Sequence, residues 1–507
     1  MFKMRWMAAL AILVMLGGGF GAVAADDTGK SVPVKKKVRK PKKISLGRYA
    51  QFKMPPGHIL VLYGAIHNAL AVRPDANYMD VSNDPAVRKL CNQHGIAAFG
   101  GPMLGSVRSD GLAVWVRTVR PAKVEVRVKV GQGEKAFGPV ASSAESDLTA
   151  VVQVKGLAPQ TTYPYRVLVD GKEIPVPDGA AITTAPRADV RGKVRIAFGA
   201  DFHEHGLGNE KQAQAIVASK PNAMLIYGDA AVGDRRNHYA MHRSDYQLRD
   251  LLPAWRMISS SIPVYDVWDD HDYYSNDMWG TRNECTDADR RAIRAVFTKA
   301  WVNPSYGFGD EKGGIFLHTQ VGPVDVIMVD NRYFRTGDKS QGDLLGREQL
   351  DWLKKELLAC KGQFIVMTCG TMWSDYISGG KDSWGQWDRK GREELFGFIE
   401  ANRIAGVLLC SGDRHGARVF SIPRPAGFKY YEFGVGTLGK MGGPEAWAKD
   451  KSNQLFGISK VYAFGEFTFD TTAPDPTVEF RLIDENSKVL FKHALTRSQL
   501  TPGGKAE

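Results

Sequence analysis

The pattern of hydrophobic and polar positions changes twice along the chain, and each change predicts a different kind of structure. Between residues 101 and 186, apolar residues alternate with polar ones. The alternation is strictest where Val124, Val126 and Val128 are separated by charged residues. A period of two is typical of strands with one buried and one wet face. The pattern therefore predicts a small β-sandwich domain over residues 101–186.

After residue 186, short apolar runs are separated by helical stretches. This alternation predicts a layered α/β domain. Its core strands are expected at residues 194–201, 223–229, 264–270, 326–330, 364–368 and 407–413. Three more strands near the carboxyl terminus, expected to complete a second sheet, cover residues 465–470, 478–483 and 489–495. Helices are expected at residues 393–402 and at the stripe formed by Leu350, Leu353, Leu357 and Leu358.

The amino terminus has the pattern of a signal peptide. Lys3 and Arg5 precede an apolar run over residues 7–14, and Ala22-Val23-Ala24 supplies the small residues that a signal peptidase requires. The apolar run is too short and too rich in glycine for a membrane span of about 20 residues. We therefore expect cleavage after residue 24 or 25 and a secreted or periplasmic protein.

The formal net charge is +12, and much of the excess lies between Lys35 and Lys43. A run of like charges predicts an exposed linker, here residues 25–43. A second interpretation is contact with an acidic envelope surface. No aromatic residues are interleaved with these lysines, so no specific nucleic-acid recognition is predicted.

The length of 507 residues exceeds what one hydrophobic core organises, so several domains are expected. Residues 44–100 are partly helical, with a helix start at Asp84-Pro85, and carry no assigned function. Five cysteines are too few for disulfides to organise a secreted chain of this size. Cys369 and Cys410 lie in apolar runs and are predicted core residues. The remaining segments are a catalytic domain over 187–497 and a tail over 498–507.

Four acidic clusters carry the candidate chemistry, because each closes an apolar strand. One such cluster alone is compatible with a salt bridge, a helix cap or a turn. A carboxylate at a buried strand end is costly unless something offsets its charge, so four together predict one convergent cation site. Mixed carboxylate and imidazole ligands suit zinc, manganese or iron, whereas calcium and magnesium prefer oxygen. The clusters are Asp201-Phe202-His203, Gly228-Asp229, Asp269-Asp270-His271-Asp272 and Asp413-Arg414-His415.

The order of these motifs resembles the metallophosphoesterase superfamily, and their details resemble its alkaline phosphatase D branch. Trp268 to Asp272 is similar to the branch's Trp-Asp-Asp-His-Glu/Asp motif, and residues 409–417 are similar to its Ser-Gly-Asp-x-His strand end. Residues 329–335 and 346–357 look like two further elements of the branch. The resemblance implies a four-layer α/β sandwich. Residues 157–167, with their tyrosines, look like part of a fibronectin type III domain in front of it.

The resemblance also implies roles for individual residues. Two cations about 3.5–4 Å apart would act on a phosphate ester and on an attacking water. The implied bridging ligand is Asp229, one metal is implied for Asp201, His203 and His415, and the other for Asp270, Asn276 and Asp413. His271 corresponds to the acid that protonates the leaving group. Arg332 is either a clamp for a phosphate oxygen or a structural salt bridge.

The chain departs from the branch at three positions. Its best-known members have cysteine in place of Asp201 and tyrosine in place of Val232. Other dinuclear phosphoesterases have a metal-binding histidine near Cys369. The metal therefore stays open among iron, zinc, manganese and calcium.

Two other functions are compatible with parts of the pattern. A calcium-binding adhesion or scaffold protein fits the β-sandwich and the acidic loops, but it does not account for the histidines. A metal-dependent hydrolase of another ester or amide fits the ligands. The natural substrate and the oligomeric state are left open.

Overall fold

The computed structural model describes residues 54–503, except 232, 338–342, 378–382, 426 and 441, and two short strands nearer the amino terminus. These strands, β1 (Ala24–Ala25) and β2 (Ser31–Val32), pair antiparallel within a unit, Met1–Ile44, that is separate from Ser45–Glu507. The predicted signal peptide and basic linker otherwise lie outside the described residues. In the part of the chain that is described, no helix combines the length and apolar character needed to cross a membrane.

Three helices occupy the segment that was predicted to be partly helical. They are α1 (Gly57–Ala71), α2 (Tyr78–Asn83) and α3 (Pro85–His94). The predicted helix start is confirmed, since the Asp84 carboxylate accepts hydrogen bonds from the backbone N–H groups of Ala86 and Val87. Pro85 occupies the first helical position, where a missing N–H costs nothing.

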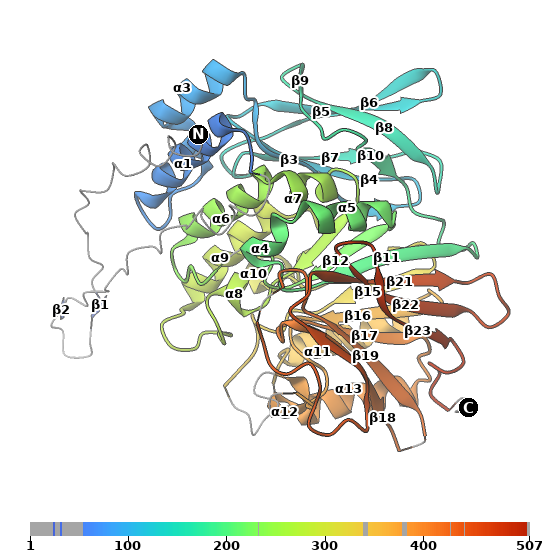
Figure 1. Ribbon diagram of the computed structural model, residues 1–507. Coiled ribbons are helices and arrows are strands. Elements are labelled where there is room, and N and C mark those ends of the chain that lie inside the picture. Colours follow the sequence, from blue (N-terminus) through green and yellow to red (C-terminus); the bar gives the residue numbers. More distant parts are fainter. Residues whose placement is uncertain are drawn as a thin grey trace, which may run out of the picture. The chain divides into compact units, whose positions relative to one another are not determined.

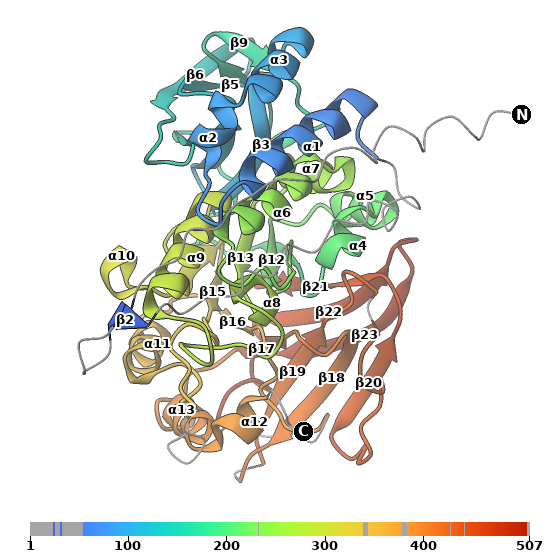
Figure 2. The same cartoon turned by 90° about the vertical axis from the view of Figure 1, so that its left-hand side faces the viewer.

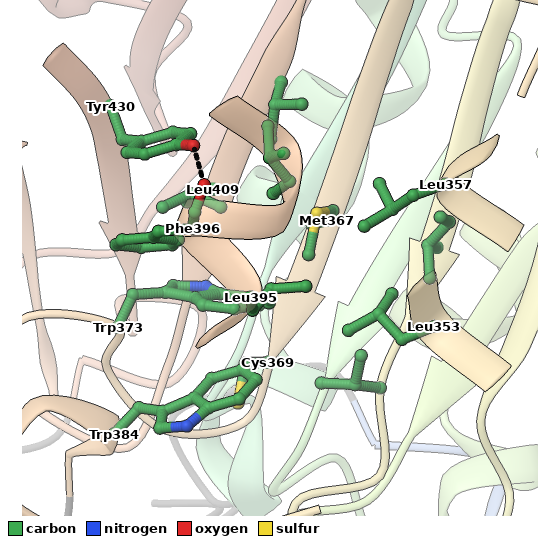
Figure 3. Packing of buried hydrophobic residues seen from close by; sticks show 14 of the residues in the cluster. Leu353, Leu357, Met367, Cys369, Trp373, Trp384, Leu395, Phe396, Leu409 and Tyr430 are labelled. Carbon is green, nitrogen blue, oxygen red and sulfur yellow. Dashed lines mark hydrogen bonds between the residues drawn. The ribbon is translucent and has the colours of Figure 1, made fainter. Parts of the chain in front are cut away.

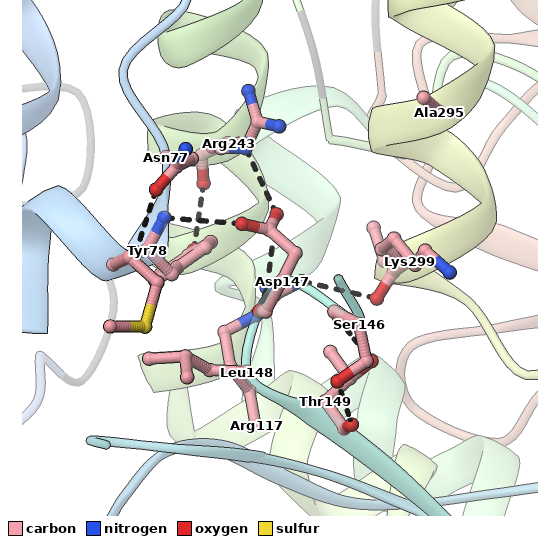
Figure 4. Close-up of polar contacts among 12 residues, drawn as sticks. Asn77, Tyr78, Arg117, Ser146, Asp147, Leu148, Thr149, Arg243, Ala295 and Lys299 are labelled. Atoms are coloured by element: carbon pink, nitrogen blue, oxygen red, sulfur yellow. Dashed lines mark hydrogen bonds and ion pairs between the residues drawn. The ribbon is translucent and has the colours of Figure 1, made fainter. Parts of the chain in front are cut away.

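A buried carboxylate, Asp147, ties these helices to the neighbouring segments (Figure 4). It accepts a hydrogen bond from Tyr78 N–H of α2 at 3.1 Å. It also pairs with Arg117 at 3.3 Å and with Arg243 at 2.9 Å. Burial alone would raise the pKa of Asp147, but the two guanidinium groups lower it below its ordinary value. The charge is therefore paired, as a buried charge must be.

Two antiparallel sheets lie in the segment that was predicted to be a β-sandwich. Val124, Val126 and Val128 are fully buried, which confirms the strand predicted from their alternation. Tyr163 accepts a hydrogen bond from Ala158 N–H at 3.0 Å, so its hydroxyl ties the chain at a corner. The three-stranded sheet contains β3 (Ala98–Arg108), β4 (Gly111–Thr118) and β7 (Thr149–Val154). The five-stranded sheet contains β5 (Lys123–Val130), β6 (Gly133–Ala141), β8 (Thr162–Val169), β9 (Lys172–Ile174) and β10 (Ala181–Thr183).

The α/β part contains two larger sheets (Figure 1). The first has the order β13-β12-β11-β21-β22-β23. The carboxyl-terminal strands, which were expected to complete a second sheet, instead extend the sheet of the first three core strands. Strands β11, β12 and β13 run parallel, and β21 is antiparallel to β11. Its strands are β11 (Lys193–Gly199), β12 (Ala223–Tyr227), β13 (Val264–Val267), β21 (Ala463–Asp470), β22 (Thr477–Asp484) and β23 (Val489–Thr496).

The second sheet has the order β14-β15-β16-β17-β19-β18-β20, in which β15, β16, β17 and β19 are parallel. The ring of Phe433 lies 5.0 Å from that of Phe467 and 4.7 Å from that of Phe480, so the two sheets pack face to face. The strands are β14 (Leu317–Val321), β15 (Val324–Met328), β16 (Phe364–Cys369), β17 (Val407–Ser411), β18 (Gly416–Pro423), β19 (Lys429–Val435) and β20 (Gln454–Ser459).

Helices α11 (Arg347–Ala359) and α13 (Arg389–Ala401) cover the second sheet (Figure 3). Leu353 and Leu357 of α11 belong to a buried cluster with Met367 and Cys369, which confirms that this cysteine is a core residue. Leu358 is the exception to the predicted stripe, since it is 60% exposed. The chain thus has a mixed α/β fold with helices on the outer side of this sheet.

Another group of helices lies between the two smaller antiparallel sheets and the sheet that contains β11, β12 and β13 (Figures 1 and 2). It includes α4 (His203–Leu207), α5 (Glu210–Ala218), α6 (Tyr239–Leu251), α7 (Pro253–Ser259) and α9 (Asp287–Ala300). The short helices α8 (Asp270–Tyr273), α10 (Gly309–Lys312) and α12 (Trp384–Trp387) lie in loops. All five cysteines are free, so no disulfide organises this arrangement.

Two adjacent leucines test the packing of α11. Leu357 is 2% exposed and Leu358 is 60% exposed. We predict that Leu357→Ala destabilises the protein by about 2–5 kcal/mol, because it leaves a cavity under the helix. Leu358→Ala, the matched control, is expected to change stability by less than about 0.5 kcal/mol. Thermal and denaturant unfolding measure both, and equal effects would contradict the assigned helix face.

Candidate metal centre

The site lies where the parallel strands end, because the carboxyl ends of parallel neighbours meet at one edge. Asp201 follows β11, Asp229 follows β12, and Asp270 begins the short helix after β13. Asp201 N–H donates to the Gly228 carbonyl at 3.1 Å, and His203 N–H donates to the Asp229 carbonyl at 2.9 Å. These bonds join the first two loops directly. Residues far apart in the sequence therefore share one site.

The first group of possible ligands consists of Asp201, His203, Asp229 and His415. One side-chain oxygen or nitrogen of each lies within 4.8 Å of the others. His203 Nε2 is 3.6 Å from Asp229 Oδ2, and the His203 and His415 rings are 5.5 Å apart. The sequence predicted all four as ligands, and the fold brings them together.

Two further groups continue from the first, one sharing Asp229 with it and the other sharing Asp270 with that second group. One consists of Asp229, Asp270 and His271, and the other of Asp269, Asp270 and Asp413. Asp229 thus belongs to two groups, which is the position that a ligand between two ions requires. Six of the seven predicted ligands, Asp201, His203, Asp229, Asp270, Asp413 and His415, belong to these groups.

Several buried atoms of the first group lack a hydrogen-bond partner within the described structure. They are both carboxylate oxygens of Asp201, Oδ2 of Asp229, Nε2 of His203 and Nδ1 of His415. Buried polar atoms are almost always hydrogen-bonded, because an unpaired one costs about 1–3 kcal/mol. Five such atoms pointing into one place fit a cation that would take their lone pairs.

Burial also shifts the pKa values of these possible ligands. Burial raises the pKa of Asp201 and, together with the neighbouring Asp270 and Asp201 carboxylates, raises that of Asp229 well above its ordinary value. Burial and the nearby rings of His271 and His415 lower the pKa of His203 well below its ordinary value. Neutral imidazole is the form that binds metals. A bound cation would offset the cost of ionising the buried carboxylates.

The backbone at the ligands is strained in one consistent way. Left-handed φ angles are found at Asp201 (60°), His203 (43°), Asp229 (54°), Asp413 (64°) and His415 (44°). Such angles are uncommon for residues other than glycine, although aspartate and histidine tolerate them best. Strain of this kind is concentrated at functional sites, where the surrounding structure maintains it.

Two glycines allow the close approach of the ligand loops. Gly228 has φ 112°, and a Cβ there would lie 2.4 Å from Cβ of Asp269. A Cβ at Gly436 would lie 2.1 Å from Oδ2 of Asp201. Gly228 is part of the predicted motif. Gly436 was not predicted, because a lone glycine after β19 carries no signal in the sequence.

His271 lies beside the proposed ligands and is held by Asp234. Its Nδ1 is 2.8 Å from Asp234 Oδ1, and its backbone N–H donates to Asp270 Oδ1 at 2.9 Å. Burial alone would lower the pKa of His271, but Asp234 and Asp270 raise it to about 9. Asp234 was not predicted, since nothing in the sequence distinguishes it from other loop aspartates.

The two remaining predicted residues are Arg332 and Asn276. Arg332 is fully buried and donates from Nη2 to Asp269 Oδ2 at 2.8 Å, and from Nε to Oδ1 at 2.5 Å. This is the structural salt bridge that the sequence left open as the alternative to a phosphate clamp. Asn276 has an exposed side chain, and its backbone N–H donates to Asp234 at 2.8 Å.

The residues that support the ligands include two further aspartates. Asp269 accepts hydrogen bonds from Arg332 and from Asn331 Nδ2, the latter at 2.8 Å. Asp272 accepts the backbone N–H of Ala230 at 3.1 Å and so fixes the loop that carries Asp229. Both aspartates stand in the predicted cluster, in which the resemblance implied a ligand role for Asp270 alone.

The fold is similar to that of two phosphatases of known structure. The structure of PhoD matches with a TM-score of 0.63 at 17% identity, over 80% of this chain and 91% of that one. The purple acid phosphatase PPD1 from yellow lupin (Lupinus luteus) seeds matches with a TM-score of 0.57 at 13% identity, over 79% of this chain and 74% of that one. At these identities the likeness shows the fold alone. No curated protein sequence matches the chain.

Two family models match the sequence. One, described as a domain of unknown function (DUF7800), covers residues 97–186, a range that contains both smaller antiparallel sheets. The other, described as PhoD-like phosphatase, covers residues 215–480, more than half of the chain. That span includes Asp229, Asp270, Asp413 and His415. The chain therefore belongs to the PhoD-like phosphatase family and is a phosphoric ester hydrolase.

Proposed function

We propose that the protein is a secreted phosphoesterase that hydrolyses phosphate esters at a dinuclear metal centre. The observation that carries the proposal is the position of Asp229, which is shared by two groups of possible ligands and has a buried oxygen without a hydrogen-bond partner. The family supports the phosphate-ester substrate.

The proposed ligands divide into two sets that meet at Asp229. Asp201, His203 and His415 hold one ion, and Asp270 and Asp413 hold the other. Asn276 belongs to the second set only if its exposed amide turns inward. When bound, the two ions supply positive charge for the phosphate oxygens and lower the pKa of water. Four carboxylates with two imidazoles favour zinc, manganese or iron over calcium.

His271 is the proposed acid that protonates the departing oxygen. Asp234 engages Nδ1, which leaves Nε2 to donate. The hydrogen bond to Asp234 also keeps the ring protonated near neutral pH, as a general acid requires. The ring contacts that of His203 at 5.4 Å between centroids, so His271 lies beside the first group of ligands.

Arg332 is assigned a positioning role instead of contact with the phosphate. Its guanidinium is buried and forms a forked pair with Asp269. Asp269 stands next to Asp270, and Gly228 packs against it. Arg332 therefore fixes the distance between the loops that carry Asp229 and Asp270.

Secretion and a fibronectin type III-like sandwich complete the proposal. The signal-peptide pattern of residues 1–24 supports secretion. The two smaller antiparallel sheets and the hydroxyl of Tyr163 support the fibronectin-like assignment. The catalytic domain that follows is proposed to be a four-layer α/β sandwich. A calcium-binding scaffold accounts for neither the histidines nor the family.

Sequencing of the mature amino terminus tests secretion. The exported protein is expected to begin at residue 25 or 26, and an intact Met1 on exported protein would contradict cleavage.

Asp229→Ala tests the dinuclear centre. We predict that it lowers bound metal and reduces phosphatase activity at least about 100-fold, because loss of even a supporting residue costs 10–100-fold. The matched control is Asp189→Ala, which removes an exposed aspartate that pairs with Arg187. Metal content by mass spectrometry and turnover of an aryl phosphate measure both. Full activity in Asp229→Ala would overturn the proposal.

His271→Ala tests the leaving-group acid. We expect unchanged metal content and a rate loss of about 10²–10⁴-fold on alkyl phosphate esters, whose alkoxide leaves poorly without a proton. Nitrophenyl esters should lose much less, because nitrophenolate departs without protonation. An equal loss on both esters, or loss of metal, would show that His271 is a ligand or a structural residue instead.

A further inference from the structure

A second cluster of metal-ligating side chains lies away from the catalytic centre. It consists of His318 on β14, Asp325 on β15 and Cys360 directly after α11. One ligand atom of each lies within 4.8 Å of the others. Asp325 lies near the start of β15, whereas Asp330, beyond the end of that strand, contacts Trp268 beside the catalytic loops. Five extended residues span about 17 Å, so the two clusters lie at opposite ends of the strand.

The backbone around the cluster holds each ligand in place. Asp325 Oδ2 accepts the N–H groups of Lys361 and Gly362 at 3.0 and 2.6 Å. This pairing leaves Oδ1 directed at His318 Nε2, at 2.9 Å. Cys360 is the residue that ends α11, and its N–H donates to the Glu356 carbonyl. The ligands therefore come from a hairpin and a helix end that are already fixed.

The distances come close to those of a tetrahedral zinc site. His318 Nε2 lies 3.9 Å from Cys360 Sγ and 2.9 Å from Asp325 Oδ1. With bond lengths of about 2.0–2.3 Å to nitrogen, oxygen and sulfur, a tetrahedral ion separates these atoms by about 3.4–3.6 Å. Shifts of about half an ångström would therefore seat the ion.

A fourth residue orients the histidine. Glu356 Oε2 lies 2.7 Å from His318 Nδ1, on the ring edge that faces away from Asp325. Histidines that bind a metal through one nitrogen usually donate the other N–H to a carboxylate, which fixes the tautomer. Glu356 supplies that carboxylate and leaves Nε2 as the ligand atom.

We propose that His318, Asp325 and Cys360 bind a thiophilic divalent cation of the zinc type, with Glu356 orienting the histidine. A thiolate and an imidazole select zinc over calcium and magnesium. The ion would fasten the end of α11 to the β14–β15 hairpin, and water would complete its coordination. The side chains of His318 and Glu356 are 19% and 24% exposed, so an ion reaches the site from solvent.

The competing interpretation is a purely hydrogen-bonded cluster. Burial alone would lower the pKa of His318, but Asp325, Cys360 and Glu356 raise it to about 10. Without a metal, the ring is an imidazolium between two carboxylates. Cys360 distinguishes the two interpretations, because an imidazolium cluster needs no thiol. Within the described residues, none of the other four cysteines belongs to a group that could hold a metal.

Cobalt substitution tests the site without relying on activity. The purified full-length protein, stripped of metal and titrated with Co²⁺, should show a thiolate-to-cobalt charge-transfer band that zinc abolishes by displacement. The catalytic groups contain no cysteine, so the band reports on Cys360 alone. It should persist in Asp229→Ala, which separates a failure here from a failure of the catalytic proposal.

Variants complete the test. Cys360→Ser and His318→Gln should lose the band, whereas Cys91→Ser, at a buried cysteine outside any such group, should retain it. Glu356→Gln should weaken cobalt binding about 10–100-fold. Circular dichroism checks the folding of each variant. The absence of a band in the wild-type protein, or its persistence in Cys360→Ser, would overturn the proposal.

Discussion

Carboxylates buried at the ends of parallel strands are the constraint on which the rest of the site depends. Asp201, Asp229 and Asp270 are each at most 1% exposed, and they stand close to one another. Several negative charges in a dry site repel one another, and each loses its hydration. A concentrated positive charge offsets both costs while the carboxylates stay ionised. The left-handed backbone at five ligand residues and the close-approach glycines serve this one arrangement.

A layer of charged side chains holds the ligand loops from outside. Arg332 fixes Asp269, Asp234 fixes His271, and Asp272 fixes the loop after β12. None of these residues needs to touch a substrate to affect the rate, because a displaced ligand loop changes the spacing of the metals. The division explains why one acidic cluster in the sequence contains both ligands and supporting residues.

The sequence predicted the strands and most of the site, because both have local signals. Each core strand is a short apolar run, and each ligand lies next to the end of such a run. Predictions were weaker where only tertiary contacts decide. Leu358 has helical spacing but faces solvent. Arg332 forms a buried salt bridge with Asp269. Asp234 and the cluster around His318 were missed, because their partners come from separate elements and show no spacing rule.

Anomalous X-ray diffraction from crystals of the purified protein tests the central claim most directly. Data collected at the absorption edges of iron, manganese and zinc locate each ion and identify it. We expect two peaks beside Asp229, each about 2.0–2.6 Å from one of its oxygens. One set should include Asp201, His203 and His415, and the other Asp270 and Asp413. The absence of peaks at this site, in protein that is active on phosphate esters, would contradict the dinuclear metal centre.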